Sequence, residues 1–465
     1  MIKNIKWLLL VSLSFVACNN DDETVTDAPA TAGSADFSKY VALGDSFAAG
    51  YSDGALFKKG QQNSYPNILA GQFSQVGGGA FNTPFCGDDN KGGLLFSGNQ
   101  IAGTRLYFTG VGPAPVSGPV VTEVLNHLPG SFNNMGVPGA KSYHLLAPNF
   151  GSASGVPAGT ANPYFVRFSS SATTTVLADA LSQNPTFFSL WIGGNDVLGY
   201  ATTGGDGTNP ITPIATFDAA YNALATQLSA GGKKGVIANL PYVSTLPFFT
   251  TVGYKPATLN ASQVAALNSA YSGYNTAVAG SALSADEKAA RTINFVVGKN
   301  AVVMVDEYLT TYGPLPKYRQ TTSADYIVLS SGGVSAQAHL MAGNGTMMPL
   351  ADKWVLSKGE VAEIITATDH YNETIFAAST ANGLAFVDAK AIMNQLVNGG
   401  VRFGNYHMTA QYVTGGAFSL DGVHPSARGY ALIANKFLEA INTKYGSTLK
   451  PVDLGNYQIQ YPSTL

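Results

Sequence analysis

From residue 37 onward, short runs rich in β-branched and aromatic residues alternate with longer segments of helical periodicity. This alternation constrains the fold most, because it favours a parallel sheet covered by helices on both faces. The sequence therefore predicts an α/β fold. The expected strands are 40–43, 131–135, 186–192, 234–239 and 384–387, and the expected helices are 65–73, 174–181, 217–228, 358–378 and 427–444.

Two long stretches depart from the alternation and are predicted to be insertions into a domain that spans residues 37–465. The first, about 77–129, is rich in Gly, Pro and aromatic residues. The second, about 243–350, contains two segments of helical periodicity and one strand-like run. Loops this long are usually functional or disordered. Either insertion could form a lid or a substrate wall, or could only cover an edge of the scaffold.

The first 17 residues contain Lys3 and Lys6, followed by a short apolar run from residue 7. This run is too short to span a bilayer, so it predicts a cleaved signal peptide over residues 1–17. Ala17 before Cys18 resembles the lipobox of bacterial lipoproteins, in which the cysteine is lipidated and becomes the first mature residue. The alternative is an ordinary signal peptide in which Cys18 has no special role.

Residues 18–36 are acidic and then rich in Ala, Thr and Pro, without a periodic apolar face, which predicts a flexible tether. Acidic residues directly after such a cysteine resemble the signals that send some lipoproteins of Bacteroidetes-type bacteria to the cell surface. We therefore expect a protein of the bacterial cell envelope, anchored through lipidated Cys18 to the outer membrane and exposed at the surface. The formal net charge of −3 gives no indication of a nucleic-acid partner.

Gly44-Asp45-Ser46 follows directly after the predicted strand 40–43. Ligands of open parallel sheets bind beyond the carboxyl ends of the strands. Gly44 permits a tight turn, so the Ser46 hydroxyl would face that crevice. Read alone, the triplet is more often a turn or a helix N-cap than a nucleophile.

A catalytic serine needs a base, a group that orients the base, and donors for the developing oxyanion. Near the C-terminus, Asp421 precedes His424 by three residues in a turn that leads into a predicted helix. That spacing lets the carboxylate reach one imidazole nitrogen while the other faces a serine. The alternative is that Asp421 caps the helix and His424 is a surface residue.

Two glycine-containing turns could supply the oxyanion donors. The predicted strand 186–192 runs into Gly193-Gly194-Asn195, where the amide of Asn195 could point into the crevice. The predicted strand 131–135 runs into the turn from Gly136 to Gly139, whose glycines let a backbone N–H approach a ligand closely. Each segment, read alone, is only a turn.

Taken together, these segments resemble the four signature blocks of the SGNH (GDSL) hydrolase family. The blocks are GDS at 44–46, NMGVPG at 134–139, GGND at 193–196 and DGVHPS at 421–426. The resemblance implies a three-layer α/β/α sandwich with a mostly parallel sheet, and ester hydrolysis through a covalent acyl-enzyme.

The resemblance also implies a role for each matching residue. Ser46 would be the nucleophile, with His424 and Asp421 completing the triad. The oxyanion hole would be formed by the backbone N–H groups of Ser46 and Gly139 and the side chain of Asn195. The choice of Gly139 over Gly136 rests on the resemblance alone.

The chain is longer than many members of that family, and the added length lies between the blocks. The substrate class therefore stays open among a lipid ester, a short acyl ester and an O-acetylated glycan. A surface lipoprotein that binds without turnover is a further alternative, although the intact triad residues argue against it. The other histidines show no metal-binding spacing and no nucleotide-binding fingerprint occurs, so neither a metal nor a cofactor is predicted. The oligomeric state stays open.

Overall fold

The computed structural model describes residues 29–87, 90–329 and 343–465. The predicted signal peptide, Cys18 and the first part of the predicted tether lie outside the described residues. Residues 31–35 of that tether pack against the end of the helix at 427–445 and the segment after it. Ser34 donates its backbone N–H to Tyr445 O, and Thr448 donates its backbone N–H to Thr31 O. The packed chain thus begins before residue 37. Local composition could not indicate this contact, because its partners lie at the opposite end of the chain.

A five-stranded parallel sheet forms the centre of the fold, in the order β15-β8-β7-β1-β6. Each strand lies within a predicted run or extends it by one residue, and the neighbouring strands β1 and β7 are buried along their whole length. Chain order reverses between β1 and β7, so ligand chemistry is expected beyond their carboxyl ends. The strands are β1 (Tyr40–Gly44), β6 (Asn134–Gly136), β7 (Phe187–Trp191), β8 (Lys234–Ala238) and β15 (Ala385–Val387).

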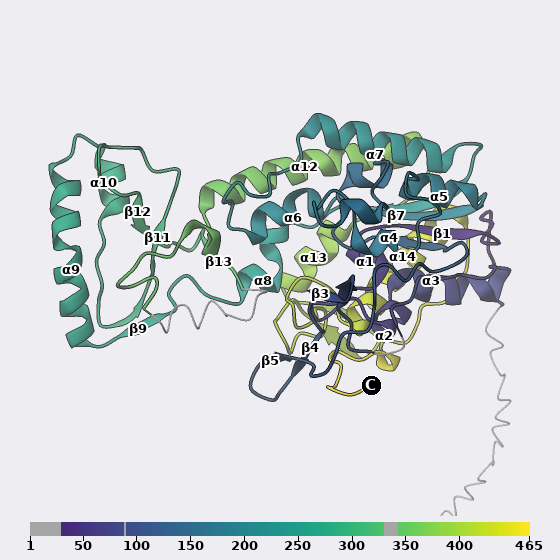
Figure 1. Cartoon of the computed structure of the whole chain (residues 1–465), viewed down its shortest axis with the longest axis horizontal. Helices are drawn as coiled ribbons and strands as arrows, with labels where there is room; N and C mark the ends of the chain where they lie inside the picture. Colours follow the sequence, from purple (N-terminus) through teal and green to yellow (C-terminus); the bar gives the residue numbers. More distant parts are fainter. Residues whose placement is uncertain (1–28, 88–89, 330–342) are drawn as a thin grey trace, which may run out of the picture.

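Helices cover both faces of this sheet, which confirms the three-layer α/β/α prediction (Figure 1). On one face, α3 (Tyr65–Phe73) packs against α14 (Ala427–Tyr445). The other face carries α5 (Val176–Ser182), α6 (Asn195–Thr202), α7 (Ile214–Ser229) and α12 (Lys358–Ala381).

Serine caps fix where three of these helices start. Ser64, Ser357 and Ser426 each accept a backbone N–H from the first turn of α3, α12 and α14, respectively. We call the central sheet and its covering helices the body. Shorter elements complete it, namely α1 (Ser46–Ala49), α2 (Lys58–Gln62), α4 (Pro163–Val166), α13 (Ala389–Val397), β16 (Val401–Phe403) and β17 (Tyr406–Met408).

The first long stretch forms two β-hairpins. They pair β2 (Leu94–Phe96) with β3 (Asn99–Ala102), and β4 (Leu106–Phe108) with β5 (Pro113–Pro115). Arg105 between them is 1% exposed and donates to the carbonyls of Asn90 and Pro462. A buried guanidinium thus ties this insertion to the C-terminal segment.

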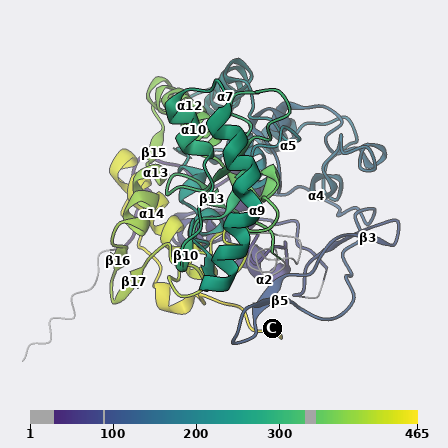
Figure 2. The same cartoon turned by 90° about the vertical axis from the view of Figure 1, so that its left-hand side faces the viewer.

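The second long stretch forms a lobe that extends from the side of the body (Figures 1 and 2). We call residues 252–327 and 343–350 the inserted lobe. It has its own apolar cluster around Leu267, Tyr271 and Phe295, and it joins the body through α8 (Pro247–Thr250), β13 (Tyr326–Ile327) and β14 (Val355–Leu356). Its other elements are β9 (Ala257–Leu259), α9 (Ala261–Gly280), α10 (Ala285–Arg291), β10 (Gly298–Asn300), β11 (Val303–Val305) and β12 (Tyr318–Gln320).

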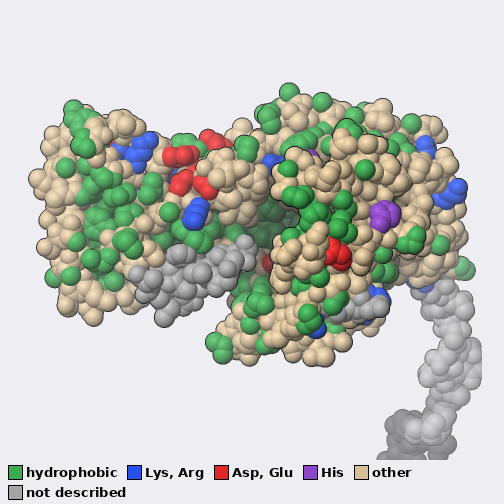
Figure 3. All heavy atoms as spheres, in the orientation of Figure 1, with side chains coloured by type: hydrophobic (Ala, Val, Ile, Leu, Met, Phe, Trp, Pro, Cys, Tyr) green, Lys and Arg blue, Asp and Glu red, His purple; other side chains and the backbone are tan. Residues whose placement is uncertain are grey.

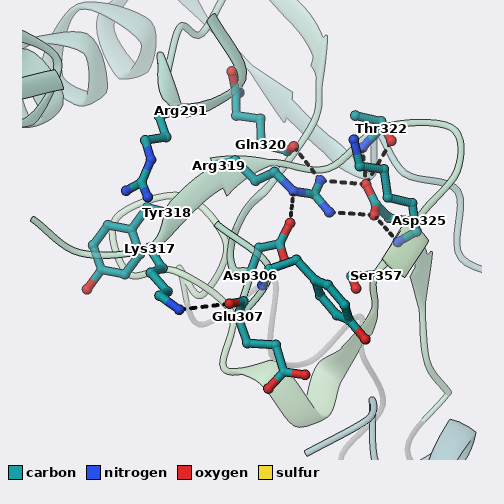
Figure 4. Close-up of polar contacts among 12 residues, drawn as sticks. Arg291, Asp306, Glu307, Lys317, Tyr318, Arg319, Gln320, Thr322, Asp325 and Ser357 are labelled. Atoms are coloured by element: carbon teal, nitrogen blue, oxygen red, sulfur yellow. Dashed lines mark hydrogen bonds and ion pairs between the residues drawn. The ribbon is translucent and has the colours of Figure 1, made fainter. Parts of the chain in front are cut away.

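A buried arginine organises the base of the inserted lobe (Figure 4). The guanidinium of Arg319 binds both carboxylate oxygens of Asp325 at 2.7 Å and also contacts Asp306. Asp325 in turn accepts the backbone N–H of Lys358 at the start of α12. This ion-pair group therefore joins the lobe to the body. The molecular surface is hollowed between the two (Figure 3).

Candidate active site

The turn from β1 into α1 places Ser46 at the sheet edge. A Cβ atom on Gly44 would lie 2.5 Å from Trp191 O, so only glycine lets β1 and β7 end this close together. Asp45 caps α1 by accepting the backbone N–H of Phe47 at 3.0 Å. Ser46 is then the first residue of the helix and is 6% exposed.

The three predicted catalytic residues form a continuous chain of hydrogen bonds, which we call the relay: Ser46, His424 and Asp421. Nε2 of His424 lies 2.8 Å from the Ser46 hydroxyl oxygen, and Nδ1 of His424 lies 2.9 Å from Oδ2 of Asp421. Ser46 and His424 are 378 residues apart in sequence. This is the geometry in which an imidazole can accept a hydroxyl proton while a carboxylate fixes its orientation.

Asp421 is held as a carboxylate by its surroundings. Its oxygens accept the backbone N–H groups of Val423, His424 and Gly54 in addition to the imidazole contact. Burial on its own would raise the pKa of Asp421, but the charge of His424 and these hydrogen bonds lower it to about 2. The group is therefore ionised at neutral pH.

Aromatic rings frame the imidazole on two sides. The ring centroids of Phe47 and Tyr51 lie 5.5 and 4.6 Å from that of His424. Tyr51 is in turn fixed by Tyr430, whose hydroxyl donates to Tyr51 O at 2.7 Å. This packing restricts the rotation of the imidazole.

The turn after β6 lies against α1. A Cβ on Gly136 would be 2.2 Å from the backbone nitrogen of Ala49, and Val137 donates its N–H to Gly44 O at 3.0 Å. Gly136 is thus a close-packing glycine. Gly139 is exposed, has a φ of +79°, and has no atom within 4 Å of an added Cβ. Of the two glycines, Gly139 is the one whose backbone is free to meet a ligand.

The first turn of α6 is tied to the same segment. Asn195 Nδ2 donates to Ala140 O at 3.0 Å, which uses one of its two hydrogens. The next residue, Asp196, is fully buried and accepts both the N–H and the hydroxyl of Ser142 at 2.8 Å. The structure therefore links the predicted donor segments around Gly139 and Asn195 to each other.

Two carboxyl groups next to the relay were not identified from the sequence as site residues. Asp53 is 1% exposed, accepts the N–H of Leu420 on Oδ1, and leaves Oδ2 without a hydrogen-bond partner. Its φ of +53° is in the left-handed region. Burial raises the pKa of Asp53 to about 7, and also raises that of Asp45 to about 7. The sequence signal for Asp53 is the Asp-Gly pair at residues 53 and 54, close after Ser46.

Within residues 29–87, 90–329 and 343–465, no three His, Cys, Asp or Glu side chains gather as a metal site would require. In the same ranges, no helix combines the length and the apolar character needed to cross a bilayer.

Comparison with solved structures finds esterases and lipases of low similarity. A variant of Axe2, an acetyl-xylooligosaccharide esterase from Geobacillus stearothermophilus, is 11% identical, with a TM-score of 0.35 over 88% of this chain and 96% of that one. An extracellular lipase from Streptomyces rimosus is 13% identical, with a TM-score of 0.32 over 87% and 98%. No curated protein is detectably similar to the chain.

The decisive similarity is to a family model. The GDSL-like lipase/acylhydrolase model matches residues 40–437, a span that runs from β1 into α14 and includes Ser46 and His424. The chain therefore belongs to the GDSL-like lipase/acylhydrolase family and is an ester-bond hydrolase.

Proposed function

We propose that this hydrolase cleaves esters by nucleophilic catalysis, with Ser46, His424 and Asp421 as its triad. The observation that carries the proposal is the relay in which His424 Nε2 lies 2.8 Å from the Ser46 hydroxyl and Nδ1 lies 2.9 Å from Asp421. The lowered pKa of Asp421 supports it, because the carboxylate must stay ionised to stabilise the imidazolium.

In the first half of the reaction, His424 Nε2 takes the hydroxyl proton as Ser46 Oγ bonds to the ester carbonyl carbon. The tetrahedral intermediate then expels the alcohol, which receives that proton from His424 and leaves an acyl group on Ser46. In the second half, a water molecule gives a proton to His424 and attacks the acyl carbon. The carboxylic acid leaves as the proton returns to Ser46.

The negative oxygen of each tetrahedral intermediate is bound by three donors. They are the backbone N–H groups of Ser46 and Gly139 and the second Nδ2 hydrogen of Asn195. The bond from Asn195 to Ala140 O and the bonds from Ser142 to Asp196 support this assignment, because they hold the donors in place before substrate arrives.

We further propose that the protein is a lipoprotein, lipidated on Cys18 and anchored at the outer membrane with the catalytic body outside. The support is the sequence of residues 1–36. Replacing Cys18 by Ala in the full chain should release the protein from the membrane fraction. Equal membrane retention of both forms would contradict the anchor.

The triad is tested by labelling with a fluorophosphonate and by hydrolysis of p-nitrophenyl acetate. The wild-type protein should react with both, and Ser46→Ala should react with neither. Ser272→Ala is the matched control, because Ser272 is an exposed serine on α9 of the inserted lobe. Equal labelling of Ser46→Ala and wild type would remove Ser46 from the mechanism.

A further inference from the structure

An apolar cavity of about 60 Å³ lies beyond the carboxyl ends of three strands of the central sheet. Trp191 at the end of β7, Pro241 after β8 and Val387 at the end of β15 form its floor. Side chains from α13 and α14 form the surrounding walls. The cavity is therefore built from rigid elements of the body.

Two further walls of the cavity are chain neighbours of the proposed triad. Phe47 follows Ser46, and Pro425 follows His424. The ring of Phe47 lies 5.5 Å from the imidazole of His424 and 5.0 Å from the indole of Trp191, measured between centroids. The side chain of Phe47 thus borders both the imidazole of His424 and the cavity.

The side chains that line the cavity favour a hydrocarbon over a sugar. Among the described residues that line the cavity, Lys436 alone carries a charge, and its amine pairs with Glu439 at 2.8 Å. The indole N–H of Trp191 is also satisfied, because it donates to Asn239 O. A sugar hydroxyl placed here would lose its hydrogen bonds to water without replacement, whereas an alkyl group would gain from leaving water.

The position of the cavity bears on which part of the ester it can hold. β6, which leads into the Gly139 turn, lies on the opposite side of β1 from β7, β8 and β15. Asn195 starts α6 on the sheet face opposite α14. A carbonyl oxygen that points to these donors leaves both the acyl chain and the alcohol on the side away from the donors, where the cavity lies. Of the two, only the acyl chain stays attached to Ser46 through both halves of the proposed reaction.

We propose that this cavity holds the first carbons of the acyl chain, so that the enzyme prefers short acyl esters to acetates. The inference rests on the function proposed above. An apolar cavity of about 150 Å³ holds a benzene molecule, so one of about 60 Å³ has room for about two or three carbons. Each methylene that enters should raise kcat/KM about fourfold, by the usual transfer free energy of a buried CH₂.

The experiment measures kcat/KM for p-nitrophenyl acetate, butyrate, hexanoate and decanoate. For the wild-type protein we expect a rise of about sixteenfold from acetate to butyrate, which has two more methylenes, and no further rise beyond hexanoate. Ala389→Leu places three carbons into the cavity and should abolish the preference for butyrate while acetate turnover persists. Ala391→Leu is the control on the same helix, because Ala391 does not line the cavity.

A second variant works in the opposite direction. Leu396→Ala removes three carbons from the wall and should shift the preferred chain length towards hexanoate or beyond. In a parallel series of butyrate esters with methyl to hexyl alcohols, both variants should leave the dependence of kcat/KM on the length of the alcohol unchanged.

Equal kcat/KM for acetate and butyrate in the wild type, or a change confined to the alcohol series, would overturn the inference. Failure of the proposed mechanism looks different, because the wild type would then neither react with the fluorophosphonate nor turn over any ester of the series.

Discussion

At the scale of single residues, the least expected group is Asp53, a buried carboxyl beneath the proposed triad. Burial raises the pKa of Asp53 to about 7, and the charge of nearby Asp421 adds to the effect. The native protein therefore binds a proton at Asp53 that the unfolded chain, with an ordinary pKa of 3.8, has already lost. A raised carboxyl pKa means that stability falls as the pH rises from about 4 to about 7.

Asp53→Asn should remove this pH dependence. Asparagine tolerates the left-handed backbone at φ +53° and can still accept the N–H of Leu420. Unfolding by urea at pH 4.5 and pH 7.5 should show the variant gaining stability over wild type at the higher pH, by at most about 4 kcal/mol. Because Asp45 titrates in the same range in both proteins, only the difference between them is diagnostic. Parallel pH profiles would contradict the assignment.

Replacing Asn195 tests the proposed oxyanion hole separately from the triad. Asn195→Ala should lower kcat about 10²- to 10³-fold with little change in KM, because its donor acts on charge that develops only in the transition state. Ser142→Ala is a useful comparison, since it loosens the bond to Asp196 without removing an oxyanion donor. We expect it to cost less than about tenfold. An unchanged kcat in Asn195→Ala would remove this side chain from the mechanism.

At the scale of elements, α8 and the loop that carries His424 are directly connected. Phe248 of α8 donates its N–H to Gly422 O at 2.9 Å, and Leu329 donates to Phe248 O at 2.9 Å. Gly422 has a φ of +73°, and a Cβ there would lie 2.9 Å from Phe248 N. The proposed triad loop is therefore packed against the segment from which the inserted lobe leaves the body.

Gly422→Ala should lower kcat/KM at least tenfold, because relief of the clash must move the loop between Asp421 and His424. Gly231→Ala is a matched control, since Gly231 has a φ of +75° and open space around an added Cβ. Both variants carry similar backbone strain, of about 1 to 2 kcal/mol, so any additional loss of thermal stability in Gly422→Ala reports the clash with Phe248. Equal activity of the two variants would show that the contact with α8 does not hold the catalytic loop.

The elements also show which parts of the fold a sequence can predict. Buried parallel strands and capped helices are local patterns, so α3 and β8 were predicted nearly to the residue. β6 is shorter than predicted, because Asn133 uses its side chain on Tyr40 O and leaves the regular ladder to begin at Asn134.

The candidate site also contains some residues that the sequence predicts and others that it does not. The residues of the relay could be predicted because each follows a strand or precedes a helix in a recognisable block. Asp53 and Asp196 could not, because their roles depend on contacts with Leu420 and Ser142, which lie far away in sequence. The cavity could not be predicted either, since its walls come from separate strands and helices.

At the scale of the whole molecule, the body and the inserted lobe have separate apolar clusters and share a small junction. Asp325 is the residue that joins them most directly. It binds Arg319 with both oxygens and accepts N–H groups from Thr322 and from Lys358 of α12. Burial would raise the pKa of Asp325, but the Arg319 contacts lower it, so the pair stays charged at neutral pH.

Asp325→Ala should therefore destabilise the lobe by about 3 to 5 kcal/mol, because it leaves the guanidinium of Arg319 buried with only Asp306 as a charged partner. Asp286→Ala is the control, since Asp286 is an exposed carboxylate on α10 of the same lobe and should cost less than about 1 kcal/mol. Differential scanning calorimetry separates the possible outcomes. An early transition that precedes the loss of p-nitrophenyl acetate hydrolysis would mean that the lobe unfolds as its own unit. A single lowered Tm would mean that the junction transmits the damage to the body, and a Tm equal to that of Asp286→Ala would contradict the role of the ion pair.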